Sequence, residues 1–316
     1  MKNSTLSILL AMLASGVVAA EAPQVHVAKW KGDAKAAFLL AFDDGCPSHL
    51  KNAIPLLNRY RIYGTFYLFP AAGHFAWQKD KWAAAAKSPY VVLGNHTIDH
   101  KGVNAPEEFE PSVVKCQGEI RAMTPDGKWP RIVSFARPGG VPWKISQEEV
   151  LAVLKKHNVT HRPEYHGPPW FCGKTEEALK LIDTTIAKGG MEHIDFHGVG
   201  GDWLSAPTDY LEAVCKRLDE KRGEIWSAAH ADYHKYVTER DAAKIEDVSV
   251  SATGVKFTVR TTLDERLYDL PLTVVVPAKG RKTAKVTVGK AKPVTVEVKD
   301  GKVLVDVVSG PVSVAF

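Results

Sequence analysis

Several features that would indicate other classes of protein are scarce or absent in this chain of 316 residues. Its four cysteines, Cys46, Cys116, Cys172 and Cys215, form no CxxC pair, which disfavours a zinc cluster or a dithiol redox motif. Beyond the N-terminal leader no apolar run reaches the length of a membrane helix, so stable membrane insertion is not expected. The formal net charge of +5 is too small to indicate binding to nucleic acid.

The C-terminal segment 247–316 also has few aromatic residues, with no tryptophan and only Tyr268 as a tyrosine. Sugar-binding modules usually present flat aromatic rings, so a carbohydrate-binding role is disfavoured for this segment. Its basic stretch from Lys279 to Lys292 contains no acidic residue. We interpret that stretch as a solvated β-ribbon in preference to a polyanion site.

The N-terminus has the pattern of a secretory leader. Lys2 is followed by a mostly apolar run over 6–13, and Val18-Ala19-Ala20 provides small residues for cleavage before Glu21. The sequence therefore predicts a signal peptide over 1–20 and a periplasmic or secreted protein; an uncleaved helix is the alternative. An oxidising compartment permits disulfides. We expect one between Cys46 and a neighbouring loop, with the partner left open, although Cys46 would also suit a buried apolar site.

Strand-like and helix-like segments alternate through the first three quarters of the chain. The predicted strands are 37–42, 65–69, 90–93, 132–136, 159–162, 193–197 and 225–228. The predicted helices between them are 50–60, 148–157, 175–188 and 208–220. Ser146 and Thr175, each followed by two acidic residues, indicate capped helix starts.

Polar residues follow the ends of several of these strands, namely Asp43, Asp44, His96, Arg137 and His197. In a (β/α) barrel the carboxyl ends of the strands meet at one mouth, whereas an open sheet would bring together only those near its switch point. The sequence thus favours a barrel over 21–243. From 247 to 316, β-branched runs separated by turn residues predict a small antiparallel β domain of sandwich type.

The pattern of carboxylates and histidines indicates metal-assisted hydrolysis. Asp43 and Asp44 end an apolar strand, so one could hold a metal while the other accepts a proton. His96 and His100 are four residues apart, which on a helix places them on one face, able to bind the same ion. Either pair alone is weak evidence; their joint occurrence after two strands is much stronger.

At these residues the chain resembles a known family. Ala41-Phe42-Asp43-Asp44-Gly45 and Asn95-His96-Thr97-Ile98-Asp99-His100 resemble the first two motifs of the polysaccharide deacetylases, carbohydrate esterase family 4 with its NodB-homology domain. Gly64-Thr65-Phe66-Tyr67-Leu68 looks like the second strand of that family. The resemblance covers roughly 35–240 and implies an irregular (β/α)7 barrel.

The resemblance also implies roles for individual residues. Asp43 would be the catalytic base, and Asp44, His96 and His100 would hold one divalent metal, with Zn²⁺ as the first expectation and Co²⁺ or Ni²⁺ as alternatives. Thr97 would brace the loop between the two histidines. The last family motif fits Ile194-Asp195-Phe196-His197-Gly198, so His197 would be the general acid.

The third family motif, R-x-P-x-G, departs from its usual form in Ala136-Arg137-Pro138-Gly139-Gly140. If Pro138 is aligned, the family arginine falls on Ala136, and Arg137 would contact substrate instead of pairing with Asp43. The Gly139 N–H would be the oxyanion donor.

Several other tryptophans and histidines lie outside these motifs. Trp170 and Trp203, beside Asp202, could line the cleft, with ordinary packing as the even alternative. His193 is interpreted as structural, deeper in the barrel. His230 and His234 are interpreted as part of a surface helix in preference to a second metal pair, and His161 and His166 as loop residues near the mouth.

The sequence therefore predicts a secreted, metal-dependent deacetylase that acts on an acetylated polysaccharide or oligosaccharide, either O-acetylated like xylan or N-acetylated like chitin and peptidoglycan. A cyclic-amide C–N hydrolase of the same fold is one alternative. A non-catalytic sugar-binding protein is the other, because the third motif is altered.

Overall fold

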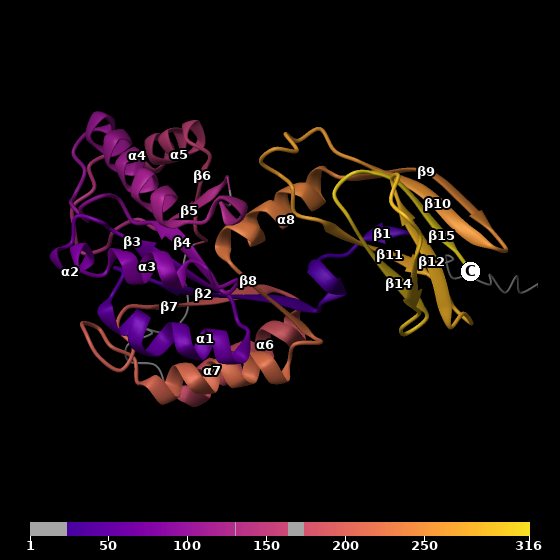
Figure 1. Ribbon diagram of the computed structural model, residues 1–316, viewed down its shortest axis with the longest axis horizontal. Helices are drawn as coiled ribbons and strands as arrows, with labels where there is room; N and C mark the ends of the chain where they lie inside the picture. Colours follow the sequence, from indigo (N-terminus) through magenta and orange to yellow (C-terminus); the bar gives the residue numbers. More distant parts are fainter. Residues whose placement is uncertain (1–23, 130, 164–173) are drawn as a thin grey trace, which may run out of the picture.

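Residues 24–129, 131–163 and 174–316 are described by a computed structural model, in which they form an α/β lobe and a β lobe (Figure 1). Helix α8 (His230–Ala242) lies between the two lobes and leads the chain from the first into the second. The predicted leader, His166, Trp170 and Cys172 lie outside the described residues.

Seven parallel strands build the α/β lobe, and all seven coincide with predicted strands. They are β2 (Ala36–Phe42), β3 (Gly64–Leu68), β4 (Val91–Asn95), β5 (Val133–Phe135), β6 (Val159–His161), β7 (Met191–Phe196) and β8 (Ile225–Ala228). Their order is β6-β5-β4-β3-β2-β7, and β8 pairs with the first half of β2. Every residue of β2 is buried, as expected for a parallel strand that is covered on both faces.

The parallel sheet is curled into a half barrel. Among the described residues β6 and β7 are its edges, so the barrel is open between them. All strands run in the same direction, and their carboxyl ends therefore lie at one rim. The predicted fold class, a barrel-like α/β domain followed by an antiparallel β domain, is confirmed.

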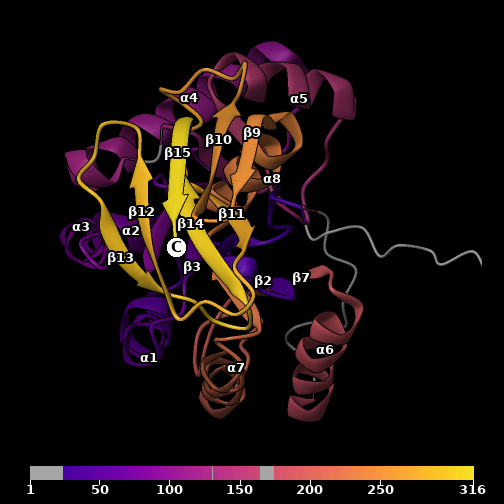
Figure 2. The ribbon, with the colours of Figure 1, turned by 90° about the vertical axis from the view of Figure 1, so that its right-hand side faces the viewer.

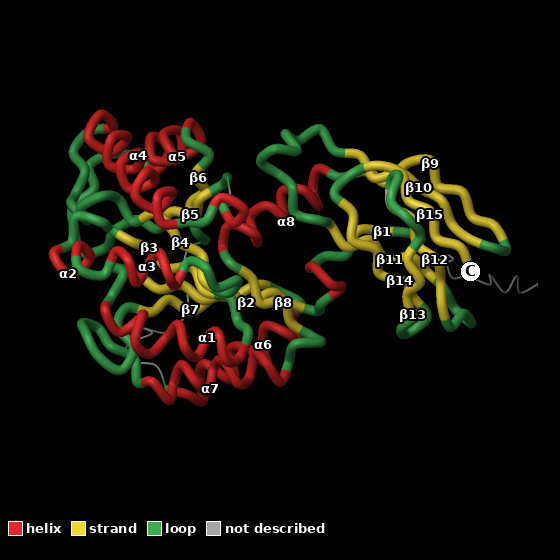
Figure 3. The backbone as a smooth tube through the Cα atoms, viewed as in Figure 1, coloured by secondary structure: helices red, strands yellow, loops and turns green. Residues whose placement is uncertain are grey.

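Helices cover the outside of this sheet on two sides (Figure 3). The helices beside β2 and β7 are α1 (Ile54–Tyr60), α6 (Thr175–Lys188) and α7 (Thr208–Glu220). Those beside β4 to β6 are α4 (Pro106–Met123) and α5 (Gln147–Lys156). The short ones are η1 (Lys31–Asp33), η2 (His49–Ala53), α2 (Gly73–Ala76), α3 (Lys79–Ala85) and η3 (Asp126–Lys128). No helix of the described ranges is long and apolar enough to cross a membrane.

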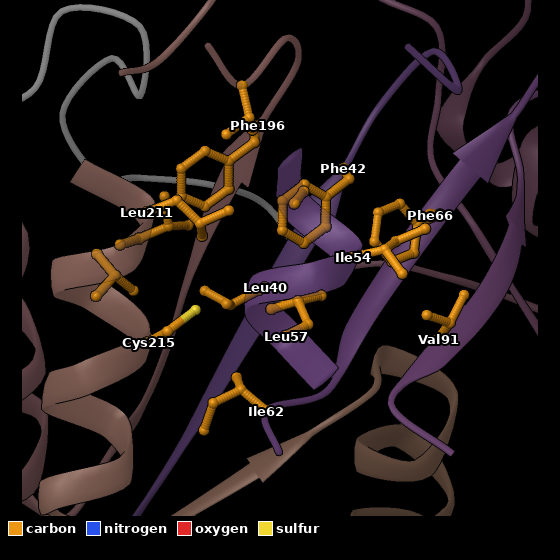
Figure 4. Packing of buried hydrophobic residues seen from close by; sticks show 14 of the residues in the cluster. Leu40, Phe42, Ile54, Leu57, Ile62, Phe66, Val91, Phe196, Leu211 and Cys215 are labelled. Carbon is orange, nitrogen blue, oxygen red and sulfur yellow. The ribbon is translucent and has the colours of Figure 1, made fainter. Parts of the chain in front are cut away.

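The core beneath the site is held by stacked aromatic rings (Figure 4). Phe42, the last residue of β2, stacks on Phe66 of β3 at 4.6 Å and on Phe196 of β7 at 5.1 Å between ring centroids. All three rings are fully buried. Each lies at or near the carboxyl end of its strand, so this stack fixes the relative position of the strands that carry the polar residues.

The helix starts agree with the sequence in one case and differ in the other. Ser146 caps α5 by a capping box, in which its hydroxyl accepts from the Glu149 N–H and its own N–H donates to Glu149. The cap predicted at Thr175 is wrong: Thr175 is the first residue of α6 itself, and the N-cap is Lys174, which makes no side-chain capping bond.

The β lobe is a sandwich of two antiparallel sheets around a valine-rich core. Its strands are β1 (His26–Val27), β9 (Lys244–Ser251), β10 (Gly254–Arg260), β11 (Leu272–Pro277), β12 (Thr283–Val288), β13 (Val294–Glu297), β14 (Lys302–Val307) and β15 (Gly310–Ala315). The five-stranded sheet, in the order β13-β12-β15-β10-β9, faces the viewer in Figure 2. The second sheet is β1-β11-β14, so a segment from the N-terminal side of the chain pairs with the C-terminal sheet.

The cysteines differ from the expectation. Cys46, Cys116 and Cys215 are buried free thiols, so the predicted disulfide from Cys46 is wrong. The Cys46 thiol instead lies 3.7 Å from the carbonyl oxygen of Asp43, to which it donates. Burial raises the pKa of Cys215 to about 12, and that of Cys116 likewise, which keeps these thiols protonated and unreactive.

Candidate active site

Three predicted metal ligands converge at the rim of the half barrel. Asp44 follows β2, and His96 and His100 follow β4. The Nε2 atoms of His96 and His100 lie 3.2 and 3.3 Å from Oδ1 of Asp44. Among the described residues these three side chains form the only group of such donors whose atoms lie within 4.8 Å of one another.

The hydrogen bond of His96 shows that a cation fits this group. Nδ1 of His96 lies 2.8 Å from the carbonyl oxygen of Ala136, which can only accept, so Nδ1 carries the proton. In the neutral ring Nε2 then presents a lone pair to Oδ1 of Asp44, which is buried and has no hydrogen-bond donor within the described structure. Two facing lone pairs repel unless a positive charge lies between them. The donor set of two imidazoles and one carboxylate is one that zinc favours.

The two histidines come together through a loop, so the prediction that they share a helical face is wrong. Residues 96–100 are not helical, and Thr97 and His100 have left-handed backbone, with φ of 62° and 55°. The His100 N–H donates to Oγ1 of Thr97 at 3.1 Å, as expected for a residue that braces the loop. Asp44 is also left-handed, with φ of 69°, and such strain in non-glycine residues concentrates at functional sites.

Asp43 is paired with an arginine that the sequence analysis did not identify. Arg162 follows β6, and its Nη1 and Nη2 donate to the two carboxylate oxygens of Asp43 at 2.8 and 3.0 Å. Asp43 is 4% exposed, so this bidentate pair is shielded from water. The nearby carboxylates raise the pKa of Arg162 despite its burial. The one available signal was its position, as the last residue of a predicted strand.

The third motif has other contacts. The Arg137 guanidinium lies 4.6 Å from the ring centroid of Trp143, and the indole N–H of Trp143 donates to the carbonyl oxygen of Pro138. Arg137 is thus directed to Trp143 instead of Asp43. Gly139 is exposed in the segment after β5, and a Cβ built there would meet nothing within 4 Å.

His197 and Trp203 complete the rim, on the segment after β7. Nε2 of His197 lies 3.5 Å from Oδ2 of Asp44, and the indole N–H of Trp203 donates to that same oxygen at 2.6 Å. Burial lowers the pKa of His197 against the opposing effect of Asp43 and Asp44. Burial alone would raise the pKa of Asp44, but His96 in its protonated form, the Trp203 N–H and protonated His197 lower it well below its usual range.

Hydrogen bonds join the segment that carries His197 and Trp203 to the residues at the start of η2. His49 Nε2 lies 2.5 Å from the carbonyl oxygen of His197, and the Ser48 N–H donates to Asp202 at 2.6 Å. His49 is buried, and burial lowers its pKa to about 4, so it donates as a neutral ring. Ser48 and His49 therefore position the segment that carries His197. The sequence analysis did not assign this role to them.

The other histidines that the sequence analysis considered are not part of the group formed by the three predicted ligands. His193 is buried beside Asp195, as expected of a structural residue, and His230 packs against it with 5.6 Å between ring centroids. His230 is 1% exposed, so its assignment to a surface helix is wrong. His234 packs on Tyr268 at 6.3 Å, and His161 on Phe135 at 5.7 Å. Burial lowers the pKa of both His230 and His234.

Comparisons with known proteins agree with the family resemblance. Residues 31–161 match the model of the family described as polysaccharide deacetylase. No curated protein matches the chain in sequence.

Solved structures show a weaker likeness. A peptidoglycan deacetylase, PdaC from Bacillus subtilis, is 16% identical with a TM-score of 0.47, over 66% of this chain and 94% of that one. A family 4 carbohydrate esterase from Streptomyces lividans, solved with acetate, is 16% identical with a TM-score of 0.43, over 61% and 92%. A family 4 pseudoenzyme from Bacillus anthracis is 16% identical with a TM-score of 0.44, over 60% of this chain and 63% of that one. At these identities the likeness assigns no role to any residue.

Proposed function

Because residues 31–161 match the model of the polysaccharide deacetylase family, we propose that the protein is a secreted, metal-dependent carbohydrate deacetylase. It would hydrolyse acetyl groups from a polysaccharide or oligosaccharide. The observation that supports this most is the position of Asp43: it is paired with Arg162 and adjoins the group formed by Asp44, His96 and His100. A proton acceptor beside a metal-binding group is the arrangement that hydrolysis by water requires.

One divalent metal would be held by Asp44, His96 and His100, with Zn²⁺ as the first candidate and Co²⁺ or Ni²⁺ as alternatives. When bound, such an ion polarises the acetyl carbonyl and lowers the pKa of water. Trp203, which donates to Oδ2 of Asp44, would orient that carboxylate and leave Oδ1 for the ion.

The residues of the chain would move the protons. Asp43 accepts a proton from the attacking water, whose oxygen joins the acetyl carbon. Arg162 holds both carboxylate oxygens and so fixes the direction in which Asp43 accepts. His197 donates a proton to the leaving oxygen or nitrogen as the bond to the acetyl carbon breaks, and acetate is released. The N–H of Gly139, an exposed residue, would donate to the oxygen that becomes negative.

The sugar would be placed by exposed groups around this rim. Trp203 is 39% exposed while its N–H is engaged with Asp44, which leaves part of the indole surface for a sugar ring. Arg137, stacked on Trp143, is a second candidate for substrate contact. Trp170 is a further candidate on sequence grounds only.

A test of the function measures acetate released from a panel of acetylated xylan, chitin oligosaccharides and peptidoglycan. We expect release from at least one substrate, loss of most turnover in Asp43→Asn, and an unchanged metal content in that variant. Retained turnover in Asp43→Asn would contradict the role of the base. Binding without release from any substrate would support the sugar-binding alternative, and opening of the ring of a cyclic amide by cleavage of its C–N bond would support the other. The mass of the exported protein should correspond to a start at Glu21.

A further inference from the structure

Arg162 touches a second buried carboxylate besides Asp43. Its Nη2 lies 3.2 Å from Oδ2 of Asp195, so one guanidinium bridges two acids. Asp195 is on β7 and is paired in register with Ala41 of β2, two residues before Asp43. Asp195 is 3% exposed and Asp43 is 4% exposed. The arrangement joins β2, β6 and β7 through a single charged group inside the half barrel.

The other carboxylate oxygen of Asp195 is contacted by a histidine. Nδ1 of His193 lies 3.0 Å from Oδ1 of Asp195, and the His193 ring meets the ring of His230 edge to face. Both the backbone N–H and Nδ1 of His230 lie within 3.3 Å of Oγ1 of Thr65. Each carboxylate oxygen of Asp195 therefore has its own partner, one on the side of the active site and one on the side of the barrel interior.

Asp195 stays ionised in this setting. Burial alone would raise its pKa, but the Arg162 guanidinium and His193 outweigh burial and lower the pKa to about 2. The ionised carboxylate of Asp195 gives Arg162 a second acceptor besides Asp43. The bidentate contact aligns the Arg162 guanidinium with Asp43, and the contact with Asp195 holds that guanidinium in place within the half barrel.

We propose that Asp195, oriented by His193, is a positioning residue for the deacetylation, which holds Arg162 in the plane from which it grips both oxygens of Asp43. The inference rests on the proposed function. Neither Asp195 nor His193 needs to touch the substrate. They act on the rate because the direction in which Asp43 accepts a proton depends on the guanidinium, and small errors in such geometry slow catalysis strongly.

The principal test is Asp195→Asn, which keeps the shape of the side chain and removes its charge. We expect kcat to fall by about tenfold or more, with KM and metal stoichiometry close to those of the wild type. The matched control is Asp183→Asn, which removes the partner of Arg217 on the surface between α6 and α7. The control should keep the wild-type kcat. An unchanged kcat in Asp195→Asn would overturn the proposal.

A double-mutant cycle with Arg162→Gln separates positioning from a general structural role. If Asp195 acts through Arg162, Asp195→Asn should cost little kcat in the Arg162→Gln background. Equal losses in both backgrounds would overturn the proposal. If Asp195→Asn does not fold, His193→Asn leaves both charges in place. It should lower kcat a few-fold at constant KM, and an unchanged kcat would count against the proposal.

A crystal structure of Asp195→Asn decides the matter without an assay. We expect the guanidinium to lose at least one of its two contacts with Asp43. If both contacts persist unchanged, the positioning inference is wrong even where the enzyme is active. If the wild type releases acetate from no substrate, the proposed function fails, while the orientation of Arg162 in the variant still supports or overturns the inference.

Discussion

At the residue scale, the backbone around the proposed metal ligands is strained before any ion is considered. Asp44, Thr97 and His100 all adopt left-handed φ, which costs non-glycine residues about 1–3 kcal/mol each. The adjoining Gly45 is left-handed as well, and a Cβ there would lie 2.9 Å from Leu68. The backbone conformation that brings Asp44, His96 and His100 together thus lowers the free energy of unfolding.

A bound metal should raise the free energy of unfolding, and this increase should depend on His100. Adding Zn²⁺ to chelator-treated protein should raise the melting temperature by several degrees, since a ligand at a thousand times its Kd stabilises the folded state by about 4 kcal/mol. His100→Ala should remove most of this increase, because it deletes one of three ligands. His157→Ala, which removes a partner of Glu110 away from the site, is the control and should keep it. Equal shifts in both variants would show that the ion binds elsewhere.

The residues that the sequence could predict are those whose spacing is local. Asp43, Asp44, His96, His100 and His197 each follow a strand, and their convergence follows from parallel strands ending at one rim. Arg162 follows a strand too, although the predicted strand included it. Its pairing with Asp43 depends on the curvature that brings β6 across from β2, and no local pattern encodes that distance.

At the element scale, α5 provides a direct test of local stabilisation. Ser146→Ala removes a hydroxyl that accepts from the Glu149 N–H, and it should lower the free energy of unfolding by about 1 kcal/mol. Thr175→Ala is the control, because Thr175 is the first residue of α6 and makes no capping bond there, and it should change stability much less. Urea denaturation of the two variants measures both effects. A larger loss in Thr175→Ala would mean that the caps are assigned to the wrong residues.

Two strands of the β lobe that the sequence did not predict share a physical cause. β15 begins at Gly310-Pro311, a pair that indicates a turn, yet it pairs with β10 and β12 in the middle of the five-stranded sheet. β9 contains a left-handed residue, Asp247, where its register with β10 shifts, and this interrupts the alternation that predicts a strand. In both cases long-range pairing outweighs the local signal.

At the scale of the whole molecule, the two lobes are joined through polar contacts around α8. The Tyr236 hydroxyl donates to the carbonyl oxygen of Ala28, and Lys235 donates to Asp269 at 2.6 Å. Oε1 of Glu239 accepts from the Leu270 N–H at 3.1 Å. Lys235 and Glu239 are 4% and 3% exposed, so the junction holds charged groups that are shielded from water. Such groups make the stability of the junction depend on pH.

The pKa of Glu239 predicts how the stability of the junction changes with pH. Burial raises its pKa from the usual 4.5 to about 7, against the opposing effect of the Leu270 N–H and Lys235. A carboxyl group with a raised pKa binds more protons when folded, so its contribution is most favourable below about pH 4.5 and is lost as pH rises through about 7. Glu239→Gln keeps an acceptor for Leu270 and has no charge to bury. We therefore expect the variant to match the wild type near pH 5 and to exceed its free energy of unfolding by about 1–3 kcal/mol near pH 8. Glu220→Gln, at an exposed position of α7, should show no such difference between the two pH values. A Glu239→Gln variant that is less stable than the wild type at pH 8 would show that the ionised carboxylate stabilises the junction.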